Sequence, residues 1–378
     1  MSASTTTTVA ELLPTIASRA AEIEAARRVP RDLLDDLIAA GCFGVLVPTS
    51  HGGAGADLVT AMRMYEDLAA ADASVGWIVM IGGGAWCDLV TLPRATFDAV
   101  FAGGPGVIVA GAFNPTGSIT PVNGGYRVEG RWGFASGCEH ADWIFGNCVE
   151  GLVDGHPMLR AALFTPDDIL IEDTWTASGM CGTASHHFRV EDLSVPPDRT
   201  WVPLQGEPCI DEPIARLHTP AFVSLVVSSV ALGIARGALD DVFALAGGKL
   251  PMLAASPLAT NPLFQHEVAV ADAELRASRS LLHATAEEIW AAGVDGRPLS
   301  LDEIARTRAS AAWATDRATH VVDTAHRFGG GTAVYADSPL QRRLRDIHTL
   351  TQHFIVRPDT LTTAGAVLAG QEPDVPIF

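Results

Sequence analysis

The sequence predicts an α+β fold with an N-terminal helical domain, a central β domain and a C-terminal helical bundle. Apolar residues recur at helical spacing up to about residue 100. Short runs of alternating polarity, separated by turn residues, then fill residues 107–202. Long helical segments return from residue 220 onward. This order of textures indicates three parts, and we place them at residues 1–104, 105–215 and 216–378.

The first domain shows both apolar periodicity and helix-end signals. Pro30 precedes one segment, where proline is tolerated, and Gly41 follows it as a C-cap glycine. The predicted helices cover residues 4–26, 31–40 and 57–71, followed by an apolar run at 75–90.

The central and last parts differ in period. Runs such as GYRVEGRWGFAS and HHFRVEDLSVP alternate in polarity, and turns such as Asn123-Gly124-Gly125 separate them. Beyond them the sequence predicts long helices at residues 221–246, 261–292, 301–327 and 339–356.

The charge balance limits the classes of partner. The chain carries 44 acidic residues against 25 Lys and Arg, a formal net charge of -19, and it has no basic run. This argues against binding to nucleic acid or to an anionic membrane surface. The first residues do not read as a signal peptide, and the apolar stretch at 220–234 is too short for a membrane span. We therefore expect a cytoplasmic protein.

Common cofactor and metal motifs do not occur in the sequence. The six cysteines form no CxxC pair, and His186-His187 lacks a third ligand at sensible spacing, so we predict no metal site. No GxGxxG joins a strand to a helix, which leaves a nicotinamide site without support. No P-loop or GxSxG nucleophile elbow is found either.

Four segments, taken together and in order, carry a family resemblance. They are LIAAGCFGVLVPTSHGGAGADL, GYRVEGRWGFASGCEHADWIF, SGMCGTASHHFRVEDLSVPPDR and HRFGGGTAVYADSPLQRRLRDIHTLTQHFIV. The chain resembles the acyl-CoA dehydrogenase superfamily over most of its length. The resemblance implies a central β-barrel domain, a C-terminal four-helix bundle, a bound flavin and a homotetramer. The long apolar run at 221–235 also favours assembly, because one bundle face rarely buries so much.

The second segment predicts a flavin-binding face. Trp132, Phe134 and Ser136 alternate along one predicted strand and so are expected to share a face, giving two aromatic walls and a hydroxyl. The alternative is an ordinary strand with its aromatic side chains in the core.

The resemblance adds further cofactor contacts. It implies that Ala112, Phe113, Asn114 and Ala135 face the flavin. It also implies that a glycine turn contacts the dinucleotide part of the flavin across a subunit boundary, although a simple interhelical turn is the alternative. The residues of this turn are Phe328, Gly329, Gly330 and Thr332.

Two departures separate the chain from true acyl-CoA dehydrogenases. Most of these carry a catalytic Glu about eight residues after an Arg-Asp pair, which here is Arg345-Asp346. That position holds Phe354, beside His353. Residues 259–275 also lack the Arg or Lys of a pyrophosphate clamp. The chain is more similar to the two-component flavin-dependent monooxygenases of this superfamily, such as p-hydroxyphenylacetate hydroxylase, dibenzothiophene monooxygenase and indole hydroxylases.

The monooxygenase resemblance implies a reaction and its participants. Reduced flavin (FADH2 or FMNH2) comes from a separate NAD(P)H flavin reductase and reacts with molecular oxygen to a flavin hydroperoxide, which hydroxylates a phenol- or indole-like substrate. Ser136 would bond near flavin N5, and His353 or His348 would act as base or acid. The expected substrate contacts are Trp86, Met80 and Phe354. An acyl-CoA or acyl-carrier-protein dehydrogenase with a displaced base, and a scaffold without flavin, are the alternatives.

Overall fold

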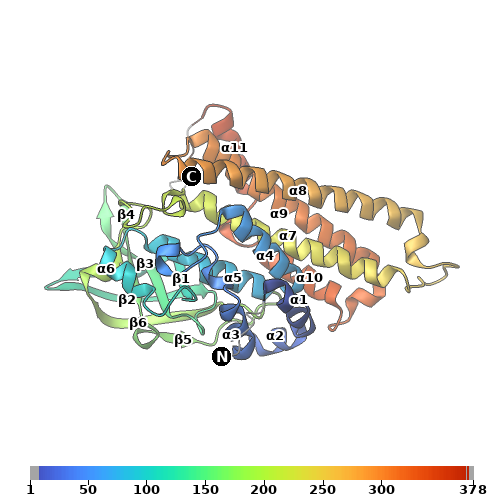
Figure 1. Ribbon diagram of the computed structural model, residues 1–378, viewed down its shortest axis with the longest axis horizontal. Helices are drawn as coiled ribbons and strands as arrows, with labels where there is room; N and C mark the ends of the chain where they lie inside the picture. Colours follow the sequence, from blue (N-terminus) through green and yellow to red (C-terminus); the bar gives the residue numbers. More distant parts are fainter. Residues whose placement is uncertain (1–7, 372, 374–378) are drawn as a thin grey trace, which may run out of the picture.

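The computed structural model describes residues 8–371 and residue 373. The sheet lies at one end of an elongated molecule, long helices extend to the other end, and the N-terminal helices pack beside both (Figure 1). Secondary structure changes between Val100 and Val109, and again between Trp201 and Thr219. The α+β class and the order helical, β, helical are confirmed.

The N-terminal domain holds six α-helices, α1 to α6. The predicted helix at 4–26 is divided at Arg19, whose guanidinium binds the carboxylates of Glu22 and Asp32, and its first residues lie outside the described part of the chain. Asp72 caps α5 by accepting the backbone N–H of Val75 at 3.0 Å. The bounds are α1 Val9–Ser18, α2 Ala20–Ala26, α3 Arg31–Ala39, α4 Leu58–Ala71, α5 Ala73–Gly84 and α6 Arg94–Val100.

The central domain is one mixed seven-stranded sheet in the order β5-β6-β2-β1-β3-β4-β7. β1 and β3 are parallel, and the other pairs are antiparallel. In the described residues the edge strands β5 and β7 do not pair, so the expected barrel is an open sheet. The bounds are β1 Val109–Val122, β2 Gly125–Ala135, β3 Trp143–Val153, β4 His156–Phe164, β5 Leu170–Glu172, β6 His186–Val195 and β7 Thr200–Trp201.

Trp132 is at the centre of the sheet's buried face. Its ring stacks on Phe188 at 5.0 Å, and its Nε1 donates to the carbonyl of Asn147 at 2.7 Å. Glycines on three neighbouring strands make room for it. A Cβ on Gly117 or on Gly146 would lie 2.1 or 2.7 Å from the ring, and Gly130 is equally close. The glycines of these strands therefore serve packing.

The bundle is built around α7, which is buried along most of its length. Among the described residues, α7 is the one helix long and apolar enough to cross a membrane, but 89% of its most apolar window is buried inside the protein, as in a core helix. The bounds are α7 Thr219–Ala246, α8 Pro262–Val294, α9 Leu301–Gly329, α10 Pro339–Leu350 and α11 Asp359–Leu368.

The last predicted helix is shorter than expected. α10 ends at Leu350, whereas the sequence predicted a helix to residue 356. His353 has an extended backbone (φ -68°, ψ 127°), and its side chain caps a short 3-10 turn, η9 (Phe354–Val356). The end of α10 thus releases His353 from the helix and lets it turn toward the N-terminal domain.

Candidate active site

Trp77 joins the three parts of the fold at one point. It lies on α5, and its indole Nε1 donates to the hydroxyl of Ser136, just after β2, at 3.0 Å. The same indole meets the ring of His353 edge-on at 5.5 Å. Two residues that the sequence proposed as catalytic, Ser136 and His353, therefore both contact one tryptophan.

Ser136 belongs to a chain of hydroxyl groups. Its Oγ lies 2.8 Å from the Oγ of Ser185, which lies 2.7 Å from Thr183 Oγ1. Thr183 donates to the carbonyl of Met180, so Ser185 must donate to Thr183, and Ser136 must donate to Ser185. The Ser136 oxygen also accepts from Trp77. Its one remaining lone pair makes Ser136 a hydrogen-bond acceptor toward a ligand.

Phe134 is an exposed ring on a strained backbone. Its φ is 63°, in the left-handed region that non-glycine residues seldom adopt, and the residue is 72% exposed. Trp175 and His187 flank the ring at 6.3 and 6.2 Å. Strain of this kind, on an apolar side chain that gains no burial from it, is typical of a ligand-binding position.

The prediction that Trp132, Phe134 and Ser136 share one face is wrong. Trp132 points into the sheet's core with no exposed surface, whereas Phe134 points to solvent. The positive φ at Phe134, together with a register shift between Trp132 and Ala135, breaks the alternation of the strand. Trp132 thus supports the site from within the sheet, and Ala135 is buried beside it.

His353 is neutral near pH 7. The side chain is half-buried, and loss of hydration lowers the pKa of its imidazole to about 4. Its Nδ1 accepts a long hydrogen bond, 3.4 Å, from the backbone N–H of Ile355. This contact favours the neutral tautomer that carries its proton on Nε2. At this pH the ring therefore carries one proton, on Nε2, and offers it as a hydrogen-bond donor.

Of the four other predicted catalytic and substrate-binding residues, one lies at the site and three do not. Phe354 is 42% exposed, and its ring lies 4.9 Å from that of His353. His348 points elsewhere and pairs with Asp323 at 2.9 Å on an exposed surface. Trp86 and Met80 are buried, so the structure does not offer them to a substrate.

Packing inside the N-terminal domain explains the position of Trp86. Its ring contacts Phe97 and Phe101 at 6.0 and 5.8 Å. The expectation that Trp86 lines the substrate site is therefore incorrect.

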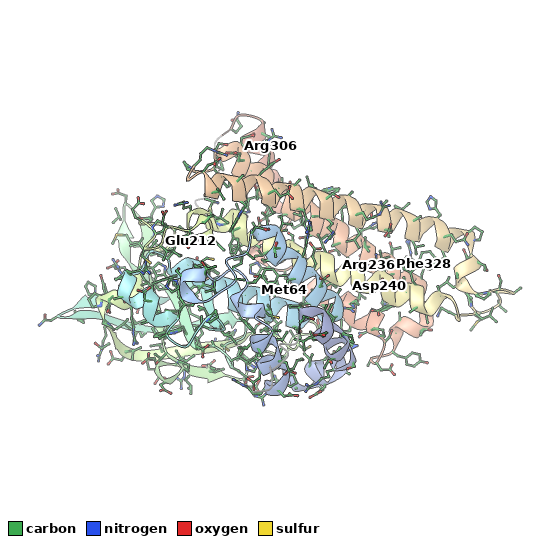
Figure 2. All side chains as sticks on the ribbon, in the orientation of Figure 1. Met64, Glu212, Arg236, Asp240, Arg306 and Phe328 are labelled. Atoms are coloured by element: carbon green, nitrogen blue, oxygen red, sulfur yellow. The ribbon has the colours of Figure 1, made fainter. Side chains whose placement is uncertain are left out.

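The predicted cofactor residues fall into two distant groups. Phe113 and Asn114 are exposed on β1, and Ala112 beside them is buried. The glycine turn instead follows α9, and Figure 2 shows Phe328 in the part of the bundle that lies away from the sheet. α9 has 29 residues and is therefore about 43 Å long. The two groups therefore lie in different parts of the subunit (Figures 1 and 2).

The glycine turn is ordered by a lysine. Lys249, the single lysine of the chain, donates to the carbonyl of Gly329 at 2.8 Å and to Thr332 Oγ1 at 2.7 Å. Gly330 has a φ of 50°. The turn therefore has a fixed shape and an adjacent positive charge.

Sequence reasoning did not identify Trp77, Thr183 or Ser185. In the sequence, Trp77 is one more apolar residue of α5, and no motif marks its indole N–H as functional. The hydroxyls lie in GTAS, a segment whose sequence signal is the family resemblance. In the described residues, no three His, Cys, Asp or Glu side chains come together as a metal site.

Two surface depressions lie away from this centre. One covers β1, β2 and β6 and is lined by ion-paired side chains, including Arg131 and Glu172 at 2.7 Å. It contains none of the predicted catalytic residues. The convergence of side chains around Trp77, rather than the size of a depression, defines the candidate site.

Comparisons with known proteins agree with this geometry. The model for the N-terminal domain of acyl-CoA dehydrogenase matches residues 6–92, and the model for the C-terminal domain matches residues 225–358. Indole-3-acetate monooxygenase of Pseudomonas putida is 33% identical over 94% of this chain and 91% of its own length.

Solved structures give the same picture. The 3-HSA hydroxylase from Rhodococcus sp. RHA1 superposes with a TM-score of 0.90 at 27% identity, covering 98% of both chains. XiaF from Streptomyces sp., solved in complex with FADH2 and glycerol, superposes with a TM-score of 0.89 at 26% identity, over 97% of this chain and 95% of that one.

Proposed function

Because this chain belongs to the acyl-CoA dehydrogenase family and matches flavin-dependent monooxygenases along nearly its full length, we propose that it hydroxylates an aromatic, phenol- or indole-like substrate with reduced flavin and molecular oxygen. The observation that carries the proposal is the exposed ring of Phe134 beside the acceptor Ser136. These two side chains offer an apolar surface and one polar contact, which suits an isoalloxazine ring.

Reduced flavin, when bound, supplies the electrons for oxygen activation, and a separate NAD(P)H reductase would provide it. Ser136 fits the reduced form, because its free lone pair can accept from the N–H at position N5. Phe134 would cover the ring. His353, neutral and in contact with the Trp77 ring, would hold the substrate by donating its Nε2–H to the substrate's oxygen.

The dehydrogenase alternative requires a carboxylate base at the flavin. His353 and Phe354 occupy the region where the family's dehydrogenases place it. The acidic residue of α5 and of the turn that follows it is Asp88, which is half-buried. The chain rises about 1.5 Å per residue in α5 and about 2.0 Å per residue in the 3-10 turn. The Cα of Asp88 therefore lies about 18 Å along the helix axis from the Cα of Trp77. Asp88 is thus poorly placed to take a proton beside Ser136.

Ser136→Ala tests the flavin contact. The fold should persist, because one hydroxyl contributes about 1 kcal/mol. A larger share of the consumed oxygen should appear as hydrogen peroxide, since the flavin loses its polar contact. Oxygen uptake, peroxide and product are measured together. The control is Ser194→Ala, which removes an exposed hydroxyl on β6. Its ratio of product formed to oxygen consumed should equal that of the parent. Parent-like coupling in Ser136→Ala would remove Ser136 from the mechanism.

Assembly follows from the two separated cofactor groups. We expect a homotetramer in which the glycine turn of one subunit approaches the flavin of another. The free end of the bundle supports this, because its apolar residues are exposed: Met252 by 92%, Val334 by 73% and Tyr335 by 68%. Light scattering at micromolar concentration should give a tetramer, and a monomer would contradict the assembly. A cytoplasmic location stays a prediction.

A further inference from the structure

The segment that precedes the hydroxyl chain is fixed to helix α10. Asp346, a buried residue of α10, accepts the backbone N–H of Met180 at 2.6 Å. The neighbouring Arg345 donates to the carbonyl of Ser178 at 2.5 Å. Gly179, between these two contacts, lies so close to the helix that an added Cβ would be 2.2 Å from the carbonyl oxygen of Arg345. The segment is therefore held against α10 on both sides of the glycine.

Met180 connects this anchor to the residues of the candidate site. Its φ of 53° lies in the left-handed region, and its side chain is buried. Its carbonyl accepts from Trp175 Nε1 at 3.0 Å and from Thr183 Oγ1 at 2.8 Å. A non-glycine residue keeps such a backbone only where its surroundings impose it, and the bond to Asp346 is one such constraint.

The Met180 carbonyl sets the direction in which the hydroxyl chain donates. A carbonyl oxygen only accepts, so Thr183 gives its proton to Met180 and accepts from Ser185. Ser136 in turn donates to Ser185 and remains an acceptor toward a ligand. If the carbonyl moved out of reach, Thr183 could donate to Ser185 instead. The chain would then be able to reverse, and the Ser136 proton would be free to point toward the ligand.

We propose that Asp346 is a positioning residue that holds the Met180 peptide, keeps Ser136 an acceptor and so makes the site select reduced over oxidised flavin. The inference rests on the proposed function, in which Ser136 accepts from flavin N5. Reduced flavin carries a hydrogen on N5, which an acceptor can bind. Oxidised flavin has no hydrogen there, and its N5 is itself an acceptor, so two acceptors would face each other.

One conservative variant keeps this hydrogen bond and another removes it. Burial and the nearby Asp72 carboxylate raise the pKa of Asp346 to about 7, but the carboxyl group offers Met180 an oxygen in either protonation state. The amide oxygen of Asn accepts in the same way. Asp346→Asn should therefore preserve the arrangement, whereas Asp346→Leu, of similar size, leaves a buried N–H without its acceptor.

Affinities for the two redox states of flavin test the inference. Dissociation constants of oxidised and of chemically reduced FAD, with FMN in parallel, are measured anaerobically for the parent and each variant. We expect Asp346→Leu to lower the ratio of the oxidised to the reduced constant about 10-fold, the scale of one net hydrogen bond. Asp346→Asn should keep the parent's ratio. A merely structural role would weaken both forms alike, and the midpoint potential of the bound flavin checks the ratio independently.

A second variant tests the same anchor without changing Asp346. Gly179→Ala forces the segment away from α10, because its Cβ would collide with the carbonyl of Arg345. It should lower the ratio in the same direction, and it decides the question if Asp346→Leu does not fold. Leu282→Ala, which leaves a cavity at a fully buried position of α8, is the control: it should lower stability and keep the parent's ratio.

Thr183 tests the hydroxyl chain separately from the anchor. Thr183→Val removes the hydroxyl that donates to the Met180 carbonyl and should lower the ratio as Asp346→Leu does. Thr183→Ser keeps that hydroxyl and should keep the ratio.

Two results would overturn the inference. One is an unchanged ratio in every folded variant of the anchor, and the other is a ratio in Asp346→Asn as low as that in Asp346→Leu. Failure of the proposed function would appear differently, as flavin that binds with the expected ratios but yields no hydroxylated product when oxygen is supplied. The two failures are therefore distinguishable.

Discussion

His353→Ala is expected to lower the hydroxylation rate about 100-fold, the usual scale for one group that handles a proton. His353 contacts the ring of Trp77, whose indole N–H donates to Ser136. Flavin binding should stay near the parent's value, because Phe134 and Ser136 are untouched. Product formation under saturating reduced flavin measures the effect, and flavin affinity is measured separately.

Two further variants sharpen the test of His353. His348→Ala should hydroxylate at the parent rate, since His348 pairs with Asp323 on an exposed surface. His353→Gln keeps a side-chain hydrogen-bond donor but cannot take a proton, so a rate well above that of His353→Ala would mean that holding the substrate matters more. Full activity of His353→Ala would show that its role is structural.

The pH dependence assigned to His353 has a definite sign. The pKa of about 4 in the folded protein lies below the ordinary value of 6.5. The neutral form therefore persists as pH falls to about 5, and the contribution of His353 to the rate should be lost only near pH 4. Folding stability should decline between pH 6.5 and 4, because the unfolded chain binds that proton first. The decline should be smaller in His353→Gln.

Trp132→Ala is expected to destabilise the protein by about 3–5 kcal/mol, the usual cost of removing a buried large aromatic side chain. The ring is completely buried among glycines of three strands, and its N–H satisfies the carbonyl of Asn147. Denaturant unfolding, followed by circular dichroism, measures the loss.

Trp132→Phe is the matched control. It keeps an aromatic ring but loses the N–H, so its destabilisation should be clearly smaller than that of Trp132→Ala. If Trp132→Ala is as stable as the parent but binds flavin poorly, Trp132 contacts the cofactor, and its core position is contradicted.

The order of the three parts could be predicted from the sequence, because apolar periodicity and turn residues are local signals. The helix α9, for example, begins at Leu301 as predicted. Helix ends were less accurate. The division at Arg19 and the end of α10 at Leu350 depend on tertiary contacts and capping, which periodicity does not contain.

The candidate site was predicted in part. Ser136 and His353 are brought together, although 217 positions separate them in the chain, and the resemblance supplied both. The face of Trp132 could not be predicted, because strict alternation assumes a regular strand and Phe134 interrupts it with a positive φ. Trp77 could not be predicted, because its importance lies in its contacts with Ser136 and His353, which are distant in the sequence.

Single-turnover oxygen transfer is the most direct test of the central claim. The protein is mixed anaerobically with chemically reduced FAD or FMN, then with buffer containing 18O2 and a panel of indoles and phenols, and products are identified by mass spectrometry. We predict a hydroxylated product that carries one 18O atom. The account would be contradicted if no 18O entered any product while acyl-CoA bleached the protein's oxidised flavin without oxygen, or if the protein bound no flavin at all.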